Sequence, residues 1–576
     1  MSLIFKTNID MKINKIFFAF VILSGLFLSS CDSFLDPLPE AQMTEKDLIA
    51  NPVYAEGLLL RAYILLPTTY SFTLDLASDD AVTNKTSSSV NTMVLGGWAS
   101  NSNPIDQWGK SYESFMYINK FMSISSKVVW ERKNHIKDSI FSRRLMGEAY
   151  ALRAVYGFNL LQSHGGVVGS DLLGYPIVTT VLTNKDNSNL PRNTYAECVK
   201  QITDDLDSAI VRLPLKWADI TGNTNHNETQ GALYTNRING LAAKLFKSRV
   251  LLYASSPAFS ASGYTWTQAA EAAAAVMKDN NGLTNITFAK TADLEFYKTY
   301  ASTEIIWASA RLVSKTDLGA ANFPPSMFGR GEVNPSQNLV ESFPNSDGTP
   351  YDTINNSIIL QYSFRDPRLA KYIVFNGSTF GGNLMTFADD ANNKNAPGRN
   401  VNSSLTGYYL KKFVHEGIKI DPGKPLVGQD QFYTYARYTE ALLNFAEAAN
   451  EAVGPTGTIA GYTYTAQAVI NAIRTRAGMT STAYINSLDK DGLRKAIKNE
   501  RRLELCFEGH RFWDIRRWND ITAMKNAVYG VKFDIDNFTT TVSKIQVRDY
   551  KDYQIYGPIP YNETLKYDLK QNNSWQ

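Results

Sequence analysis

The sequence predicts a mostly α-helical protein, in which helices pair through short turns and one long region is rich in loops. Apolar residues recur three to four positions apart over long segments in both halves of the chain. Several such segments follow one another after short turns, as in helical pairs of the tetratricopeptide kind, but no repeat of about 34 residues is evident. Periodicity alone therefore indicates a mostly helical, solenoid-like chain.

Residues 1–30 have the three parts of a bacterial lipoprotein signal peptide. Lys12 and Lys15 precede an apolar run over 16–28, and a run of about a dozen residues suits a secretory signal but is short for a membrane span. The run ends in Leu-Ser-Ser-Cys, which resembles a lipobox, so we expect cleavage after Ser30 and a lipid anchor of two or more acyl chains on Cys31. An ordinary signal peptide followed by a cysteine is the alternative, and Met11 is an alternative start.

Residues 31–52 are predicted to form an extended, lipidated tether, because Pro37, Pro39 and sparse apolar residues disfavour a helix. The residues after the signal peptide suffice for one large domain or for two to four ordinary ones. In the first half of the chain the apolar spacing predicts helices over 53–66, 106–129, 141–162, 195–213, 238–253 and 269–277. The clearest is 141–162, whose end is marked by His164-Gly165-Gly166.

The stretch from about 279 to 425 changes character. It is rich in Gly, Asn, Ser, Thr and Pro, and we expect long loops with a few strands, a setting in which binding sites often lie. Trp307 alternates with aliphatic residues in a strand-like run and is expected in the core. Helices are predicted to return over 436–452, 466–477 and 488–508.

Charge and composition argue against a nucleic-acid partner. Removing the signal peptide takes away Lys6, Lys12, Lys15 and Asp10, which leaves 55 of 58 basic and 54 of 55 acidic side chains. A nearly neutral chain has no basic field to hold nucleic acid, so a neutral ligand is favoured. Aromatic residues make up 12% of the chain, and we expect most in the core and some on a sugar-binding face.

Motifs for catalysis or metal binding are missing from the sequence. The five histidines form no HExxH pattern and no cysteine–histidine zinc pattern, and no nucleophile elbow or P-loop occurs. Residues 534–537 alternate oxygen ligands but lack the glycine and glutamate of a calcium loop, so a solvated acidic loop is favoured. Cys198 and Cys506 are expected to be free buried thiols rather than one disulfide. We expect no enzyme, no cofactor and no metal site; a glycosidase carboxylate pair among the 55 acidic residues is the alternative.

Residues 499–518 combine Arg and Glu with Leu, Phe and Trp, without separate polar and apolar faces. Because Arg can bind a carboxylate with two hydrogen bonds while its plane stacks on a ring, this pattern predicts ion pairs partly buried at a helix junction. An anion or nucleic-acid site is the alternative, which the nearly neutral charge disfavours.

This segment resembles the C-terminal signature of the RagB/SusD family of nutrient-binding outer-membrane lipoproteins. An ordered series of further segments agrees, namely residues 31–36, 146–154, 334–340, 365–369, 408–413, 437–448, 473–479 and 556–560. The resemblance implies a single domain over residues 53–576, in which a tetratricopeptide-like helical-pair scaffold carries a loop-rich ligand-binding region over about 279–425. It also implies a non-catalytic, surface-exposed, lipid-anchored protein of the outer membrane. Its partners would be a glycan and a TonB-dependent transporter of the SusC type.

The family's binding aromatics often lie in an early loop and in the central loops. Trp and Tyr stack on the apolar faces of sugar rings, while Asn, Asp and Arg bond the hydroxyl rim. The candidates are Asp79, Asp80, Trp98 and Asn101 in the early loop, and Phe323, Phe328 and Arg330 in the central loops. Gly96-Gly97 and the following Asn-Ser-Asn-Pro predict an exposed Trp98, and packing on the helix near Asp106 is the alternative.

Two rival functions stay open at this point. One is an extracellular polysaccharide hydrolase. The other is a family member that binds peptide or another non-sugar nutrient, or that serves mainly in assembly.

Overall fold

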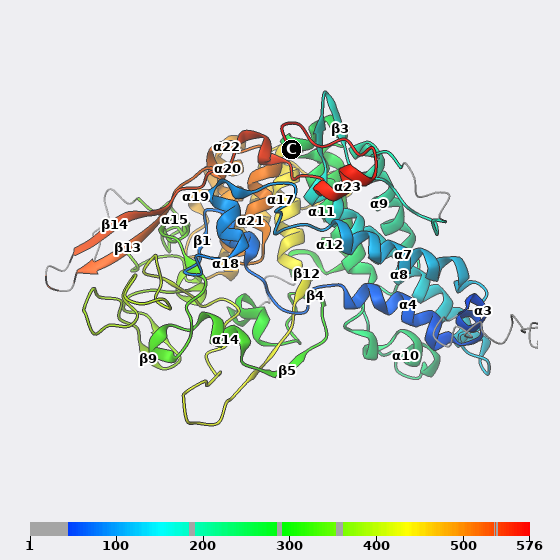
Figure 1. Ribbon diagram of the computed structural model, residues 1–576, viewed down its shortest axis with the longest axis horizontal. Coiled ribbons are helices and arrows are strands. Elements are labelled where there is room, and N and C mark those ends of the chain that lie inside the picture. Colours follow the sequence, from blue (N-terminus) through cyan, green and yellow to red (C-terminus); the bar gives the residue numbers. More distant parts are fainter. Residues whose placement is uncertain are drawn as a thin grey trace, which may run out of the picture.

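Long helices pack side by side in one part of the molecule, and loops with short strands form the other part, at the lower left of Figure 1. The computed structural model describes residues 44–183, 190–284, 291–352, 361–534, 536 and 539–575. The signal peptide, Cys31 and most of the predicted tether therefore lie outside the described residues. None of the helices within the described ranges is both long and apolar enough to cross a membrane.

The long helices form a continuous stack. Its members are α4 (Pro52–Ile64), α7 (Trp108–Ser125), α8 (His135–His164), α9 (Tyr195–Ile210), α11 (Gly240–Ser255), α12 (Trp266–Asp279), α17 (Tyr438–Val453), α18 (Ala466–Arg476) and α20 (Lys490–Glu504). Neighbouring members pack together along the series, and α17 contacts α12 on one side and both α18 and α20 on the other. The predicted helical-pair scaffold is confirmed.

The loop-rich region is an insertion between α12 and α17. These two helices pack directly on each other although about 160 residues separate them in sequence. The insertion closes on itself, because β4 (Ile305–Ala308) near its start pairs antiparallel with β12 (Thr434–Arg437) at its end. Trp307 of β4 is buried, as predicted.

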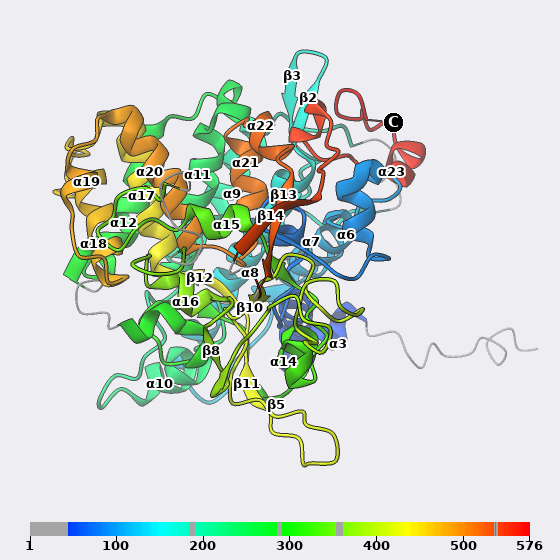
Figure 2. The same cartoon turned by 90° about the vertical axis from the view of Figure 1, so that its left-hand side faces the viewer.

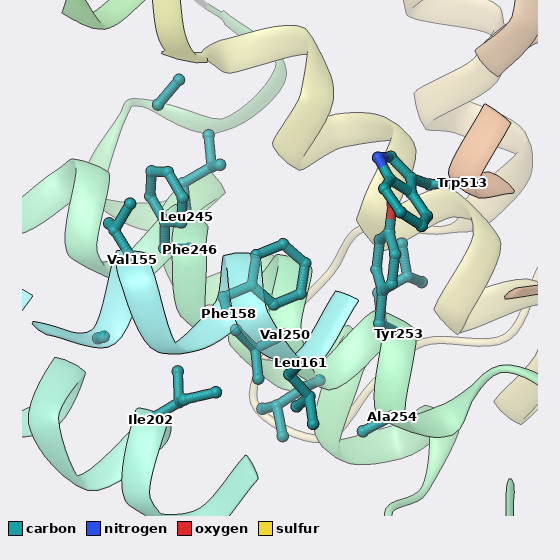
Figure 3. Packing of buried hydrophobic residues seen from close by; sticks show 14 of the residues in the cluster. Val155, Phe158, Leu161, Ile202, Leu245, Phe246, Val250, Tyr253, Ala254 and Trp513 are labelled. Carbon is teal, nitrogen blue, oxygen red and sulfur yellow. The ribbon is translucent and has the colours of Figure 1, made fainter. Parts of the chain in front are cut away.

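Small residues and caps explain the tight packing of the stack. Gly157 of α8 lies so close to α9 that an added Cβ would meet Tyr175 and Ile202. Thr194 and Thr265 form capping boxes that fix the starts of α9 and α12. Figure 3 shows the resulting core, where Phe158 of α8 packs between side chains of α9 and α11. Burial of such a ring contributes about 1.5–3 kcal/mol.

Shorter elements complete the fold. The other helices are α3 (Glu45–Ala50), α5 (Thr73–Leu76), α6 (Ser89–Thr92), η1 (Met93–Gly97), α10 (Thr224–Gln230), η2 (Ala232–Tyr234), η3 (Pro257–Ser262), η4 (Thr291–Lys298), α14 (Asp317–Asn322), η5 (Pro325–Met327), α15 (Gln337–Ser342), α16 (Arg368–Tyr372), α19 (Ala483–Asn486), α21 (His510–Arg517), α22 (Ile521–Met524), η7 (Asp552–Ile555) and α23 (Tyr561–Lys566).

The strands form antiparallel pairs. Besides β4–β12, these are β1 (Ala81–Val82) with β6 (Asn334–Pro335), β2 (Gly166–Val168) with β3 (Asp171–Leu173), β5 (Leu312–Lys315) with β11 (Gln429–Gln431), β7 (Ile373–Val374) with β10 (Tyr409–Leu410), β8 (Thr379–Phe380) with β9 (Asn383–Leu384), and β13 (Val528–Asp534) with β14 (Thr539–Gln546). Most of them are two to four residues long and lie in or beside the insertion, which agrees with the prediction of long loops with a few strands.

Three predicted boundaries are wrong. Residues 45–50 of the predicted tether form α3, because Thr44 and Asp47 make a capping box and Leu48 is buried beside α4 and α7. Helix α8 begins at His135 rather than at residue 141, because the Asn134 side chain caps it by accepting hydrogen bonds from two backbone N–H groups. The helix predicted over 488–508 ends at Glu504, since Phe507 and Gly509 have positive φ angles of 62° and 76°.

The ion pairs predicted in residues 499–518 are present, and those of Glu500 and Glu504 are buried. Arg368 of the insertion bonds Glu500 and Glu504 of α20 at 2.6 and 2.9 Å. Burial raises the pKa of Glu504, but Arg476, Arg437 and Arg368 more than offset this effect, so that the pKa lies well below its usual range. The network ties the insertion to the helical scaffold and so fixes the position of its loops. Cys198 and Cys506 are free and buried, as expected.

Candidate ligand-binding site

The structure brings the early loop and the central loop together, although about 250 residues separate them. Strand β1 pairs with β6, where Ala81 lies opposite Pro335. Beyond this pair, the Asn84 amide donates a hydrogen bond to the Arg330 carbonyl oxygen at 2.9 Å. Lys85 lies 3.5 Å from the Glu332 carboxylate. We refer to Asn84, Lys85, Phe328, Arg330 and Glu332 as the loop face.

Phe328 precedes Arg330 by two residues and is 52% exposed. It ends the 3₁₀ turn η5 with a φ angle of 65°, a conformation that L-residues other than glycine rarely adopt. The turn is fixed because Gly329 lies against Phe323, where any Cβ would come within 2.2 Å of a backbone oxygen. The surrounding fold therefore holds an aromatic ring outward in a strained conformation, a feature that is common at ligand sites.

Charged groups follow Phe328 closely along the chain. The Arg330 guanidinium binds the Glu332 carboxylate at 2.6 Å, and about half of the Arg330 side chain stays exposed. Lys85 is more exposed still. An aromatic face edged by exposed donors and acceptors can stack on a sugar ring and bond its hydroxyl groups.

Phe323 has a different role from the one predicted. It is buried, and its ring packs edge-on against Phe380 at 5.5 Å. It therefore supports the turn that carries Phe328, and the prediction that Phe323 contacts a ligand is wrong.

Asp79 and Asp80 are also buried and already paired. Asp79 accepts hydrogen bonds from Arg511 at 2.9 and 3.1 Å, and Asp80 accepts one from Arg502 at 2.7 Å. Burial raises the pKa of Asp79, but Arg502 and Arg511 outweigh it and hold the pKa below its usual range. The two carboxylates fasten the early loop to α20 and α21, so the prediction that they contact a ligand is wrong.

Trp98 is only 3% exposed, and the prediction of an exposed ring is wrong. Its indole packs edge-on against Trp575 at 5.0 Å and against Tyr550 at 6.1 Å. Its N–H donates to Asn103 at 3.0 Å. The C-terminal segment thus covers a loop that the local sequence suggests is open.

Asn101 is exposed, in the turn closed by the pairing of Ala99 with Ser102. No hydrogen bond or ion pair within the described parts of the chain joins it to the loop face. Of the seven predicted ligand residues, Phe328 and Arg330 are the ones that the structure brings together at a surface.

Comparisons with known proteins identify the family. A model of the SusD family matches residues 298–575, and a second model, described as starch-binding and associating with the outer membrane, matches residues 33–236. The chain belongs to the SusD family. A SusD-like protein of Formosa agariphila is 23% identical over 555 residues, which cover 91% of this chain and 95% of that protein.

Solved structures of SusD-like proteins share the fold. One from Bacteroides fragilis superposes with a TM-score of 0.74 at 23% identity, covering 94% of this chain and all of that chain. A laminarin-binding SusD-like protein superposes with a TM-score of 0.60 at 18% identity, covering 91% of this chain and all of that chain. These likenesses confirm the predicted helical architecture of this SusD-like chain.

Three residues of the loop face were not predicted from the sequence of this SusD-like protein. Asn84, Lys85 and Glu332 are polar residues in loops, and the β1–β6 pairing is what brings them together. The signal that could have found Asn84 and Lys85 is the polar run Thr-Asn-Lys-Thr-Ser-Ser-Ser directly after an apolar pair, whereas no comparable local signal marks Glu332. No group of three His, Cys, Asp or Glu side chains among the described residues is arranged to hold a metal ion.

Proposed function

We propose that this SusD-like protein is a surface-exposed, lipid-anchored receptor of the outer membrane that binds oligosaccharide or polysaccharide through the loop face. It hands the glycan to a TonB-dependent transporter of the SusC type and catalyses no reaction. The observation that carries the proposal is Phe328, an exposed ring in a strained turn two residues before Arg330, whose guanidinium pairs with Glu332.

Physical chemistry favours a sugar at such a surface. A pyranose ring has an apolar C–H face of about the size of a phenyl ring and a rim of hydroxyl groups. Phe328 can cover the face, while Arg330 and Lys85 supply donors and Glu332 supplies acceptors. The family description as starch-binding and the laminarin-binding structural neighbour support the same class of ligand.

Exposed aliphatic side chains support a partner at the insertion. Val313, Leu384, Val401 and Leu426 are all more than two-thirds exposed, and they lie in loops and short strands of the insertion. Both views place these loops at the lower end of the molecule (Figures 1 and 2). Apolar area at loop tips is what a protein partner would cover, and we propose the transporter as that partner.

A glycan array on the protein without its signal peptide tests ligand binding, and titrations of variants test the site. Phe328→Ala and Arg330→Ala should each weaken glycan binding at least tenfold. Phe364→Ala is the matched control, because Phe364 is also an exposed phenylalanine with positive φ in the insertion and is not part of the loop face. Equal losses in the Phe328 and Phe364 variants would remove the loop face from the proposal.

Two further measurements separate the rivals. Release of new reducing ends from a glycan panel would favour the polysaccharide hydrolase, and binding of peptides with no glycan binding would favour the non-sugar receptor. The membrane part is tested with labelled palmitate, which should be incorporated into the full chain and lost in Cys31→Ala.

A further inference from the structure

A second cleft, distinct from the loop face, lies where the insertion meets the helical scaffold. It has a volume of about 350 Å³ and is bordered by residues 67–74, by α7 and α8, and by α11, α17, α21 and β12. A volume of this size lies at the lower end of the range for small-molecule sites, about 300–1,000 Å³, which fits one or two sugar rings. None of the described residues that line it belongs to the loop face. We call it the tyrosine cleft.

Three tyrosines supply flat and rigid walls. The rings of Tyr70 and Tyr433 lie 4.9 Å apart, and those of Tyr433 and Tyr435 lie 5.2 Å apart. Tyr70 also stacks on Phe413 at 3.8 Å, and the Tyr435 hydroxyl donates to the Pro67 carbonyl at 2.7 Å. All three rings are partly exposed and held in place, so they cost little ordering entropy when a ligand stacks on them.

Large apolar rings from the scaffold line the cleft as well. Phe158 of α8, Tyr253 of α11 and Trp513 of α21 contribute to the lining. Figure 3 shows the Tyr253 ring directed toward the Trp513 indole, with Phe158 nearby. These rings are packed in the hydrophobic core, so the part of the cleft wall that they form is fixed.

Polar side chains converge on the same cleft without protein partners. Gln107 at the start of α7, Asn159 and Gln162 on α8, and His510 at the start of α21 all line it. None of these four side chains forms a hydrogen bond or ion pair with any residue that the structure describes. They come from three helices, so local sequence alone does not account for their meeting.

The charged lining residues, in contrast, are largely satisfied within the protein. Arg249 binds both oxygens of Glu440 at 2.6 Å, and Arg437 bonds Glu508 at 2.7 and 2.9 Å. Burial lowers the pKa of His510, which favours a neutral imidazole that can donate and accept. The groups left for a ligand are thus mainly neutral amides, an imidazole and tyrosine rings, with Lys110 as an exposed cation at the side.

We propose that the tyrosine cleft is a second saccharide site, which binds one or two neutral pyranose units between Tyr70, Tyr433 and the amides of Asn159 and Gln162. It rests on the proposed glycan-binding function and adds a site for a free disaccharide or for a chain end, because its volume does not admit a long chain. The loop face is open and can take an internal stretch of polysaccharide.

Calorimetric titration with a panel of neutral disaccharides, and with the corresponding polysaccharide, tests the site. Asn159→Leu and Gln162→Met keep the volume of each side chain and remove its hydrogen-bonding groups. Because neither amide is bonded in the protein, both variants should unfold at the wild-type temperature. Each should lose at least tenfold in affinity for the disaccharide, and Tyr433→Ala should lose a similar amount.

Phe328→Ala separates the two sites. It should weaken polysaccharide binding and leave disaccharide binding unchanged. If the polysaccharide binds at the loop face and disaccharide affinity is absent or the same in Asn159→Leu, Gln162→Met and wild type, this inference is overturned and the proposed function stands. If no glycan of any length binds the wild type, the proposed function itself fails. Tight disaccharide binding with no gain for polysaccharide would assign the cleft to free sugars rather than chain ends.

Discussion

Replacing Trp98 with alanine should destabilise the fold and leave the loop face intact. The indole is 3% exposed and packs on Trp575, Tyr550 and Phe512, with centroid distances of 5.0, 6.1 and 6.0 Å. The Arg516 guanidinium also lies 5.3 Å from the Trp98 ring. Truncating a buried Trp to Ala typically costs about 3–5 kcal/mol, because it removes apolar burial and leaves a cavity. We therefore expect the unfolding free energy to fall by about 4 kcal/mol, a value that includes the lost hydrogen bond from the indole N–H to Asn103.

The melting temperature should fall by a measurable amount. The unfolding entropy is about 2.1 cal/mol/K per residue, so a cooperative unit of roughly 500 residues loses about 1 °C for each kcal/mol. Differential scanning calorimetry should therefore place Trp98→Ala about 4 °C below the wild type. Phe328→Ala, at an exposed position, should stay within about 1 °C.

The two variants together decide whether burial has been assigned correctly. Trp98→Ala should bind glycan like the wild type below its unfolding transition, whereas Phe328→Ala should bind weakly while remaining fully stable. A Trp98 variant that melts with the wild type and loses glycan affinity would refute the argument, since the indole would then have to be exposed to the ligand.

Three further predictions concern the buried charges and thiols. Arg368→Met should cost about 3–5 kcal/mol in urea unfolding, because it leaves Asp366 buried without its cation and takes one of the cations from Glu500 and Glu504. Arg61→Met, at an exposed pair, should cost less than about 1 kcal/mol. Similar costs for the two would contradict the role of the network. Burial raises the pKa of Asp75 to about 8, so the folded state holds the proton more tightly than the unfolded chain does. The unfolding free energy should therefore fall as pH rises from 5 to 8, by up to about 4 kcal/mol more in the wild type than in Asp75→Asn. Parallel pH profiles of the two proteins would contradict the buried, protonated Asp75. Burial raises the pKa of both Cys198 and Cys506 to about 12, so Ellman's reagent should find no reactive thiol from either residue in the native protein at pH 8 and both after denaturation.

Local sequence signals were sufficient for the helical scaffold. Apolar spacing predicted α9, α11 and α12 to within a few residues. Their starts also depend on nearby side chains, since Thr194 and Thr265 cap α9 and α12. The errors also arise at helix starts. Asn134 and Thr44 are good caps whose helices lack a strong apolar stripe at the start, so that periodicity alone placed α8 too late and missed α3.

The charge pattern of residues 499–518 contained more information than was used. Its five arginines exceed its four acidic residues, which indicates that some guanidinium groups have partners outside the segment, either carboxylates or, as for Arg516, backbone carbonyl oxygens. Arg502 and Arg511 find theirs in Asp79 and Asp80 of the early loop. An acidic pair in a polar loop was thus predicted as a ligand site when it is the anchor that holds the loop in place.

Exposure was predictable where a turn decides it and unpredictable where a distant segment does. Phe328 points outward because Pro324-Pro325 and Gly329 fix a tight turn around it, and these residues can be read in the sequence. Trp98 also follows two glycines, but the end of the chain folds back and covers it with Trp575. Two aromatic residues in similar Gly-rich surroundings therefore have opposite roles, and the difference arises from a contact between nearly opposite ends of the sequence. A sugar-binding aromatic in this fold is best sought where the local turn alone forces the ring outward.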